Sequence, residues 1–470
     1  MPDEVILTAP DDHTPGWPAV LAPVALAVAV LTTLSWRHPG LRLVDFLGFS
    51  ARGHRLLSGE DLVHPLYPSG YPALLGLLQA GPFDPITAGR VLSIGAAALA
   101  VGVVSRWLGP AAGVWLLVQP VFLTYGASEG TDLPAFALGL TALALRSSKR
   151  PALAGAALGL AALTRYTSAA LLPVVLWPHA EDTHRKRTFG MALGAFIATT
   201  LPHWGVALVT GAPVLPDQSS NFAIGANAVV HGLGVDSLAR LPSGLASAVP
   251  FVFSGPGVGL GLLALVIAAI LSARARTSTD APLRLGAWGL IHVTLVAVAF
   301  ANTRLVLPTR LAWALGLAVL LRSRPRILLG LSVAVGLWTL PPAWSRSTGE
   351  VRLTEVVDLL ASLDGPLRTG HFLTTDPWVH RRNGARLESG TPMREAGGDP
   401  RTLDARRIAD FARARGDVLV VVDVGRVHAT YPGLTPLLQS SDTATQAGLR
   451  PVGRTPGYRV FAVEPAPESP

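Results

Sequence analysis

The residues best suited to chemistry lie in one polar stretch, Leu43 to Leu78, which follows the first strongly apolar segment. It opens with a single acid, Asp45, and continues through a polar patch that contains Glu60, Asp61 and His64. Carboxylate and imidazole groups accept or donate protons in catalysis and bind divalent cations. We therefore expect the chemistry of the protein in this connection, which returns to apolar sequence through a proline-rich turn.

Composition places this stretch in a membrane protein. Half of the 470 residues are hydrophobic and only 14% are charged, whereas water-soluble domains carry about 25% charged residues. The chain has no cysteine, which excludes disulfides, thiolate metal sites and cysteine nucleophiles.

The net charge of +8 could suggest a nucleic-acid partner, but its distribution argues against one. Four short basic clusters lie between apolar segments and account for the whole excess, as the positive-inside rule expects of cytoplasmic loops. The N-terminus is acidic where a signal peptide would be basic, so we interpret 19–36 as a retained first span. The clusters are Arg146/Lys149/Arg150, Arg185/Lys186/Arg187, Arg274/Arg276/Arg284 and Arg322/Arg324/Arg326.

The predicted fold is an α-helical polytopic membrane protein with a C-terminal soluble α/β domain. Apolar runs of about 14 to 22 residues predict about eleven transmembrane helices. They lie near 19–36, 87–107, 111–126, 132–146, 151–164, 166–178, 189–210, 255–272, 285–301, 305–321 and 327–340. The predicted parts are a cytoplasmic tail (1–18), a transmembrane domain (19–340) with a first outer loop (37–86), a linker (341–349) and an extracytoplasmic domain (350–470).

This topology gathers five ionisable residues on the side opposite the basic clusters. They are Asp45, Glu129, Asp132, Arg165 and Arg304, at a water–membrane boundary where buried charge is costly and usually functional. The alternative is that charges simply mark the ends of helices.

Shorter amphipathic pieces should cover the same side. Phe49 to Leu57 predicts an interfacial helix with Phe49, Leu56 and Leu57 toward lipid and Arg52, His54 and Arg55 toward headgroups. The run 71–78 predicts a second interfacial helix or the oblique start of the next crossing, and 211–250 is predicted to be a long polar loop.

The last 120 or so residues predict a small α/β unit. Helical spacing covers 353–363, 404–415 (ended by Gly416) and 431–439, whereas 417–423 is a buried strand. Two further strands in 449–463 flank a Pro456-Gly457 turn.

The order of motifs resembles the GT-C class of membrane glycosyltransferases, in particular bacterial relatives of dolichyl-phosphate-mannose protein mannosyltransferases (family 39-like). The matching motifs are Asp45 after the first span, the turn 64–68 (HPLYP), Ser128-Glu129, 159–165 (GLAALTR) and 302–308 (NTRLVLP). Two departures leave the metal site and the acceptor type open. A single acid precedes Phe46 where many relatives have an acidic pair, and His64 stands where a proline is common.

The resemblance implies transfer of a sugar from a polyprenyl-phosphate donor to an acceptor hydroxyl or amine, on a lipid, glycan or protein, with inversion. Asp45 would then be the catalytic base, Arg165 and Arg304 would bind the donor phosphate, and Tyr67 and Tyr71 would line the donor or acceptor groove. The alternatives are a solvated loop acid at Asp45 and arginines that snorkel to headgroups.

A divalent metal cation is a further expectation, with Glu129, Asp132, Glu60, Asp61 and His64 as candidate ligands. The spacing is not a metal signature. Asp132 could instead cap the helix that starts at Thr131-Asp132-Leu133-Pro134, and Glu129 could simply be exposed.

Two other classes stay open: a multi-pass transporter or flippase of a lipid-linked or small polar solute, and a scaffold whose outer domain does the work. A transporter predicts charges or broken helices at mid-membrane in two matching halves, which the sequence does not show. Many arginines and only two lysines indicate a GC-rich bacterial genome, so we expect a bacterial inner (cell) membrane. Whether the outside is a periplasm or the exterior of a single-membrane cell stays open.

Overall fold

The computed structural model describes most of the chain as two compact units, one up to Trp344 and one after it. The described residues are 15–38, 46–60, 62, 68–178, 184–210, 235–254, 257–275, 280–299, 306–344, 355–375 (except 357, 361, 366 and 368–370), 390–392 and 402–465.

The first unit is helical. Its elements are α1 (Trp17–Arg37), α2 (Phe46–Leu57), α3 (Gly70–Gln79), α4 (Pro85–Leu108), α5 (Pro110–Leu117), α6 (Pro120–Gly126), α7 (Asp132–Ser147), α8 (Pro151–Thr164), the 3₁₀ turn η1 (Tyr166–Leu171), α9 (Leu172–Leu176), α10 (Arg185–Thr210), α12 (Val235–Phe253), α13 (Val258–Ala275), α14 (Asp280–Ala299), α15 (Leu307–Leu320) and α16 (Pro325–Trp344).

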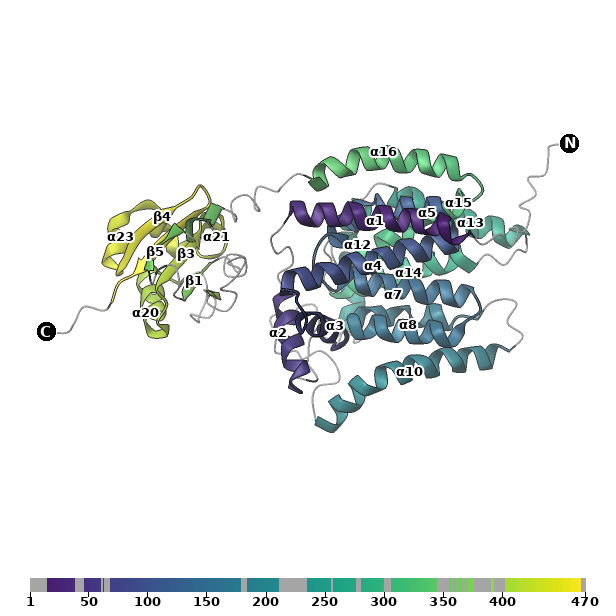
Figure 1. The fold of residues 1–470 in the computed structure, drawn as a ribbon, viewed down its shortest axis with the longest axis horizontal. Helices are drawn as coiled ribbons and strands as arrows, with labels where there is room; N and C mark the ends of the chain where they lie inside the picture. The colour runs from purple at the N-terminus through teal and green to yellow at the C-terminus, as the bar shows by residue number, and fades with distance from the viewer. Residues whose placement is uncertain are drawn as a thin grey trace. The chain divides into compact units, whose positions relative to one another are not determined.

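The long helices pack in two layers. α1, α4, α7, α8 and α10 lie side by side in that order, and α13, α15, α14 and α12 pack behind them (Figure 1). The two short helices α2 and α3 pack against each other at one end of α4, α7 and α8 (Figure 1). Because α2 and α3 belong to the predicted first outer loop, this end is the one where we expect the site.

Small residues bring these helices close together. A Cβ on Gly155 of α8 would collide with the backbone carbonyl of Ala192 in α10, and one on Gly261 of α13 would collide with Trp313 of α15. Such close backbone approach is how helices associate in a membrane, where apolar burial alone drives little association.

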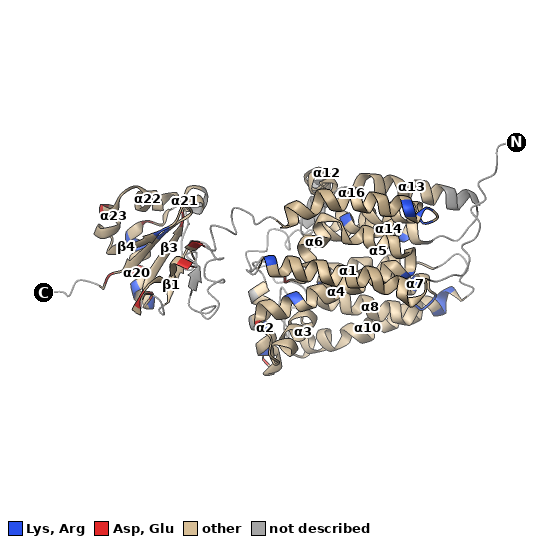
Figure 2. Ribbon diagram, turned by 45° about the horizontal axis from the view of Figure 1, so that its top comes forward, with Lys and Arg blue, Asp and Glu red and all other residues tan. Residues whose placement is uncertain are grey.

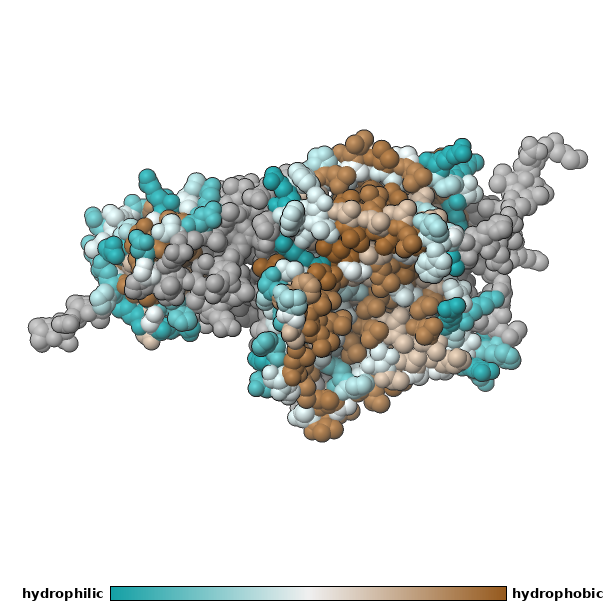
Figure 3. All heavy atoms as spheres, viewed as in Figure 1, coloured by the Kyte–Doolittle hydropathy of each residue, from teal (hydrophilic) through white to brown (hydrophobic). Residues whose placement is uncertain are grey.

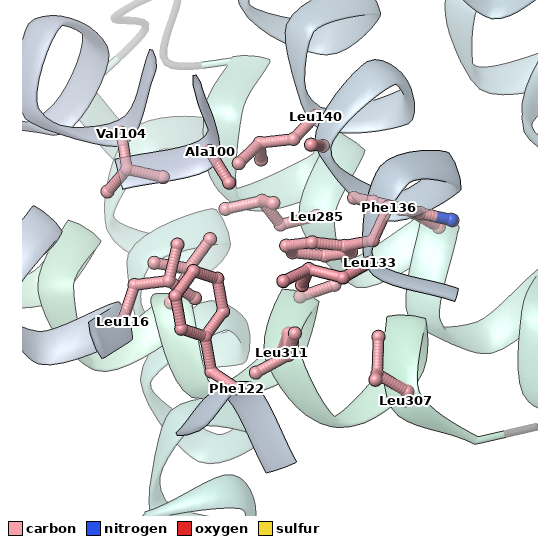
Figure 4. Close-up of a cluster of buried hydrophobic side chains, with 14 of the residues drawn as sticks. Ala100, Val104, Leu116, Phe122, Leu133, Phe136, Leu140, Leu285, Leu307 and Leu311 are labelled. Atoms are coloured by element: carbon pink, nitrogen blue, oxygen red, sulfur yellow. The ribbon is translucent and has the colours of Figure 1, made fainter. Parts of the chain in front are cut away.

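The core of the helical unit is a continuous apolar cluster. Phe122, Phe136 and Leu285 point toward one another from α6, α7 and α14 (Figure 4). The ring of Phe136 also stacks on Trp288, with 5.2 Å between ring centroids. This cluster fixes α7 and α14, the two helices that flank the pocket described below.

The outer surface of the helical unit fits a membrane. Figure 3 shows an apolar belt across the unit, with hydrophilic residues toward both ends. Among the described helices, α1, α4, α10 and α16 are long and apolar enough to cross a bilayer. The bent pair α12 and α13, at 104°, passes the same test as one broken span.

Three predicted segments differ from the observed helices. The run 111–126 is two helices, because Gln119-Pro120 interrupts it and Pro120 starts α6. The run 166–178 is η1 followed by the five residues of α9. The last part of the predicted loop 211–250 is helix α12, whereas 211–234 lies outside the described residues.

The second unit is an α/β fold around a five-stranded sheet of order β2-β1-β3-β5-β4. Strands β1 (Phe372–Thr374), β2 (Gly390–Pro392) and β3 (Leu419–Asp423) are parallel, whereas β5 (Tyr458–Val463) is antiparallel to β3 and to β4 (Leu449–Arg454). The helices are α20 (Ala405–Arg415), α21 (Val424–Thr430), η5 (Pro432–Leu434), α22 (Thr435–Gln439) and α23 (Ser441–Gln446).

The predicted helix 404–415, buried strand and Pro456-Gly457 turn are confirmed, whereas the predicted helix 431–439 is η5 followed by α22. Asp404 caps α20 by accepting from Arg407 N, and Gly416 ends the helix in the left-handed conformation with φ 74°. The predicted buried strand is β3, and the Pro456-Gly457 turn connects β4 to β5.

Candidate active site

The candidate active site begins with Asp132 and Arg165, which two neighbouring helices bring together. α7 begins at Asp132 and α8 ends just before Arg165, so the α7–α8 hairpin places both residues at one end. Arg165 Nη1 forms an ion pair with Asp132 Oδ1 and lies 3.4 Å from the Thr131 hydroxyl. Asp132 is 4% exposed and Arg165 19%, so the cation is reachable while the anion is buried. Capping of α7 alone therefore does not explain Asp132.

A second buried ion pair lies at the same end. Arg90 Nε is 3.8 Å from Glu129 Oε2, and Glu129 is fully buried, so the alternative that it is merely exposed is wrong. Arg90 also donates to the carbonyls of Ser35 (3.2 Å) and His38 (2.6 Å), at the end of α1. It therefore ties the end of α1, just before the first outer loop, to the connection between α6 and α7.

Phe46 packs directly against this second pair. Its ring is fully buried on Gly89 of α4, where an added Cβ would meet both the ring and Glu129 Cβ. Gly89 is thus the position that lets Phe46 approach Glu129.

Tyr71 supports the same connection from α3. Its hydroxyl accepts a hydrogen bond from Gly130 N (3.1 Å), and its ring meets Phe49 edge-on, with centroids 5.5 Å apart. Tyr71 is fully buried. It therefore does not line an open groove, contrary to the prediction from the sequence.

Helix α2 also differs from its prediction. Phe49 (4% exposed) and Arg52 (1% exposed) are buried instead of facing lipid and headgroups, whereas His54, Arg55 and Leu57 are exposed. Arg52 donates to Pro68 O (3.1 Å) and to the Ser69 hydroxyl (2.7 Å). Its charge therefore holds the segment of the first outer loop that leads into α3.

From Ser69 a hydrogen-bond chain continues into the bundle. The Ser69 hydroxyl donates to Leu62 O (2.7 Å), so it accepts from His203 Nδ1 (3.1 Å). The other ring nitrogen, His203 Nε2, then accepts from the Tyr166 hydroxyl (3.0 Å). Sequence reasoning missed His203, although an ionisable residue inside an apolar run was the available signal.

A small pocket lies against the Asp132–Arg165 pair, with room for about one water molecule. Ser168, Trp288 and His292 are among its lining residues. The Thr309 hydroxyl donates to Gly289 O (3.1 Å), so it accepts from His292 Nδ1 (3.3 Å). His292 Nε2 is then a hydrogen-bond acceptor beside the pair, a second histidine that sequence reasoning missed.

Five predicted site residues lie outside the described residues: Asp45, Asp61, His64, Tyr67 and Arg304. Glu60 is described and exposed, at the end of the turn that follows α2. No group of three His, Asp or Glu side chains suited to a metal occurs among the described residues.

The opposite end of the helical unit carries most of its basic residues (Figure 2). Two of them, Arg146 and Arg284, are buried instead of facing headgroups. Arg146 donates to the carbonyls of Val175 (3.0 Å) and Trp177 (3.1 Å), and Arg284 donates to those of Val174 and Trp177 (3.0 Å). These two arginines cap the carboxyl end of α9.

Two crystal structures of ArnT from Cupriavidus metallidurans are similar to this chain over almost its whole length. The structure bound to undecaprenyl phosphate gives a TM-score of 0.55 at 13% identity, and the apo structure gives 0.52 at 14% identity. Each match covers 94% of this chain and 97% of the ArnT chain. No family profile and no curated protein matches the sequence.

At this identity the likeness concerns the fold. A match of this length must include most of the helical unit and most of the α/β unit. The chain therefore has the same fold as ArnT.

Proposed function

We propose that the protein is an integral membrane glycosyltransferase that moves a sugar from a polyprenyl-phosphate donor to an acceptor hydroxyl or amine, with inversion. The proposal is supported by the fold it shares with ArnT, which was crystallised with undecaprenyl phosphate. The sugar is a hexose or pentose, the acceptor is a lipid, glycan or protein, and the reaction takes place at the outer face of a bacterial inner membrane.

The observation that carries the proposal is the partly exposed guanidinium of Arg165 above a buried carboxylate. A guanidinium stays charged at all physiological pH values and binds phosphate bidentately. A donor phosphate would share or replace Asp132 as the partner of Arg165, so the cation is preorganised for an anion and needs no new desolvation. Arg304 would bind the same phosphate.

Asp45 is the proposed catalytic base. The residue that follows it in the chain, Phe46, is buried against Gly89 and Glu129. A carboxylate next to this anchor in the sequence would take the acceptor proton as the new glycosidic bond forms.

A divalent metal ion stays a prediction, and no step of the proposed reaction depends on one. Of the proposed ligands, Glu129 and Asp132 are held by Arg90 and Arg165, and Glu60 is exposed. The other candidate ligands, Asp61 and His64, lie outside the described residues.

The proposed topology has about eleven crossings, a cytoplasmic N-terminus and an extracytoplasmic C-terminal unit. Because the chain lacks cysteine, single substitutions report the side of each connection. Ser148→Cys should react only with membrane-permeant maleimides in intact cells, whereas Ser441→Cys should react with impermeant ones. The reverse pattern would contradict the orientation.

The test of function uses purified protein in lipid with a panel of radiolabelled polyprenyl-phosphate sugars, wild type beside Asp45→Asn. Release of free polyprenyl phosphate by the wild type, lowered about 100-fold or more in the variant, supports the assignment. No release from any donor, together with saturable uptake of a solute into vesicles, would instead support a transporter.

A further inference from the structure

The second unit contains a cleft that the proposed reaction does not use. Its volume is about 370 Å³, and it lies between the α22–α23 segment and the β4–β5 hairpin. This size falls in the range of about 300–1,000 Å³ that is common for small-molecule sites. Leu438, Gln439 and Ser441 line one side, and Arg454 and Arg459 line the other.

The sheet determines where the two arginines lie. Residues two apart in a strand share a face, so Arg459 lies on the same face as Phe461, which packs against Leu437 in the core under α22. Arg454 is directly opposite Arg459 in the β4–β5 register. A register shift between Pro451 and Gly453 precedes Arg454, and such bulges often redirect side chains beside binding sites.

Two like charges directly opposite each other destabilise an antiparallel pair. Neither arginine forms an ion pair with any described residue, and no acid is among the residues that line the cleft. Other arginines of this unit do have acidic neighbours. Arg413 pairs with Asp410 (2.5 Å), Arg415 with Asp417 (3.8 Å) and Arg450 with Glu464 (4.0 Å). Stabilisation of the fold therefore does not explain why Arg454 and Arg459 both face the cleft.

Arg459 is held in one orientation. Its Nη1 donates to the carbonyls of Thr455 (3.1 Å) and Tyr458 (3.2 Å), within its own hairpin. Its Nε and Nη2 groups make no hydrogen bond with a described residue. These two nitrogens form the edge of a guanidinium that binds carboxylate or phosphate bidentately, and a fixed side chain loses little entropy on binding.

We propose that this cleft binds a saccharide that carries a carboxylate or phosphate group. The anion lies between Arg454 and Arg459, and the sugar contacts the apolar side chain of Leu438 and the polar groups of Gln439 and Ser441. The anionic group of the ligand is inferred from the two arginines alone, whereas the saccharide part of the ligand rests on the proposed function.

The test titrates the full-length protein in nanodiscs with glucose 6-phosphate, glucuronate, glucose and inorganic phosphate, with binding followed by calorimetry. The variants are Arg454→Gln and Arg459→Gln. The control is Arg450→Gln, on the same strand and outside the cleft lining. No donor lipid is present, so the result does not depend on whether sugar transfer occurs.

The wild type and the control should bind at least one charged sugar, and each cleft variant should bind it about tenfold or more weakly, equivalent to about 1.4 kcal/mol. Without ligand, Arg454→Gln should melt at the same temperature as the wild type or higher, because a like-charge contact is removed. If Arg454 only stabilised the fold, its replacement would lower the melting temperature.

Absence of binding to every anion, or equal binding by the wild type and both cleft variants, would overturn the anion site. Glucose binding as tight as that of the charged sugars would overturn it as well. Inorganic phosphate binding as tight as glucose 6-phosphate would overturn the saccharide part.

Discussion

The buried arginines at the basic end of the helical unit and the partly exposed arginines at the opposite end have different partners. At the basic end, Arg146 and Arg284 donate to backbone carbonyls at the end of α9. At the opposite end, Arg90 and Arg165 face the carboxylates of Glu129 and Asp132.

The partner decides what such an arginine can do. A carbonyl at the end of a helix is a neutral, fixed acceptor that would be unsatisfied without its donor, so the arginine is a structural cap. A carboxylate is an anion that another anion can replace. Removing Arg165 should therefore impair ligand binding, whereas removing Arg146 should impair folding.

The largest expected effect is that of Arg165→Gln. Loss of a positioned cation at a developing negative charge costs about 100- to 1,000-fold in turnover. Release of polyprenyl phosphate by purified protein measures it. The matched Arg146→Gln protein, corrected for its folded fraction, should keep its activity, and an equal loss in both variants would remove the distinction between the two ends.

Gly89→Ala should have the next largest effect, a loss of about 10- to 100-fold in turnover, because small displacements of catalytic groups slow the reaction strongly. The new methyl group would lie 2.6 Å from Phe46 Cζ and 2.7 Å from Glu129 Cβ. Gly95→Ala on the same helix is the control, since its Cβ meets nothing within 4 Å. Similar activities of the two variants would show that the Phe46 anchor does not position the site.

Arg146→Ala should lower stability by about 2–4 kcal/mol, since two carbonyls lose a charged donor. Thermal unfolding in detergent, followed by size-exclusion fluorescence, reports the change as a lower melting temperature. An unchanged melting temperature would mean that water forms hydrogen bonds with the carbonyls at the end of α9 in place of Arg146, and that Arg146 is dispensable for stability.

The smallest effect is expected for Tyr166→Phe, which removes one neutral hydrogen bond to His203 and costs about 1 kcal/mol. Turnover should change little, because Tyr166 supports the first outer loop through His203 and Ser69. A drop in turnover as large as that of Arg165→Gln would instead place this hydrogen-bond chain in the reaction.

Much of this arrangement could be predicted from the sequence. The α7–α8 hairpin follows from two apolar runs with a basic turn between them, which puts Asp132 and Arg165 at the same end. In the second unit, the helical spacing of 404–415 and the stop at Gly416 are local signals that gave α20 nearly to the residue.

The partners of buried charges could not be predicted, because they depend on how helices pack. Nothing in the spacing of Arg90 and Glu129 says that they meet, or that Arg90 also holds the end of α1. The burial of Phe49 and Arg52 has the same origin, since α3 packs against α2 and Arg52 donates to the backbone at Pro68.

Binding of undecaprenyl phosphate tests the central claim most directly. The wild type, Arg165→Gln and Arg146→Gln would be compared by native mass spectrometry and by ligand-induced thermal stabilisation. We predict that the wild type and Arg146→Gln bind the lipid and that Arg165→Gln binds it about tenfold or more weakly. Equal binding by all three proteins, or no binding by the wild type, would contradict the account.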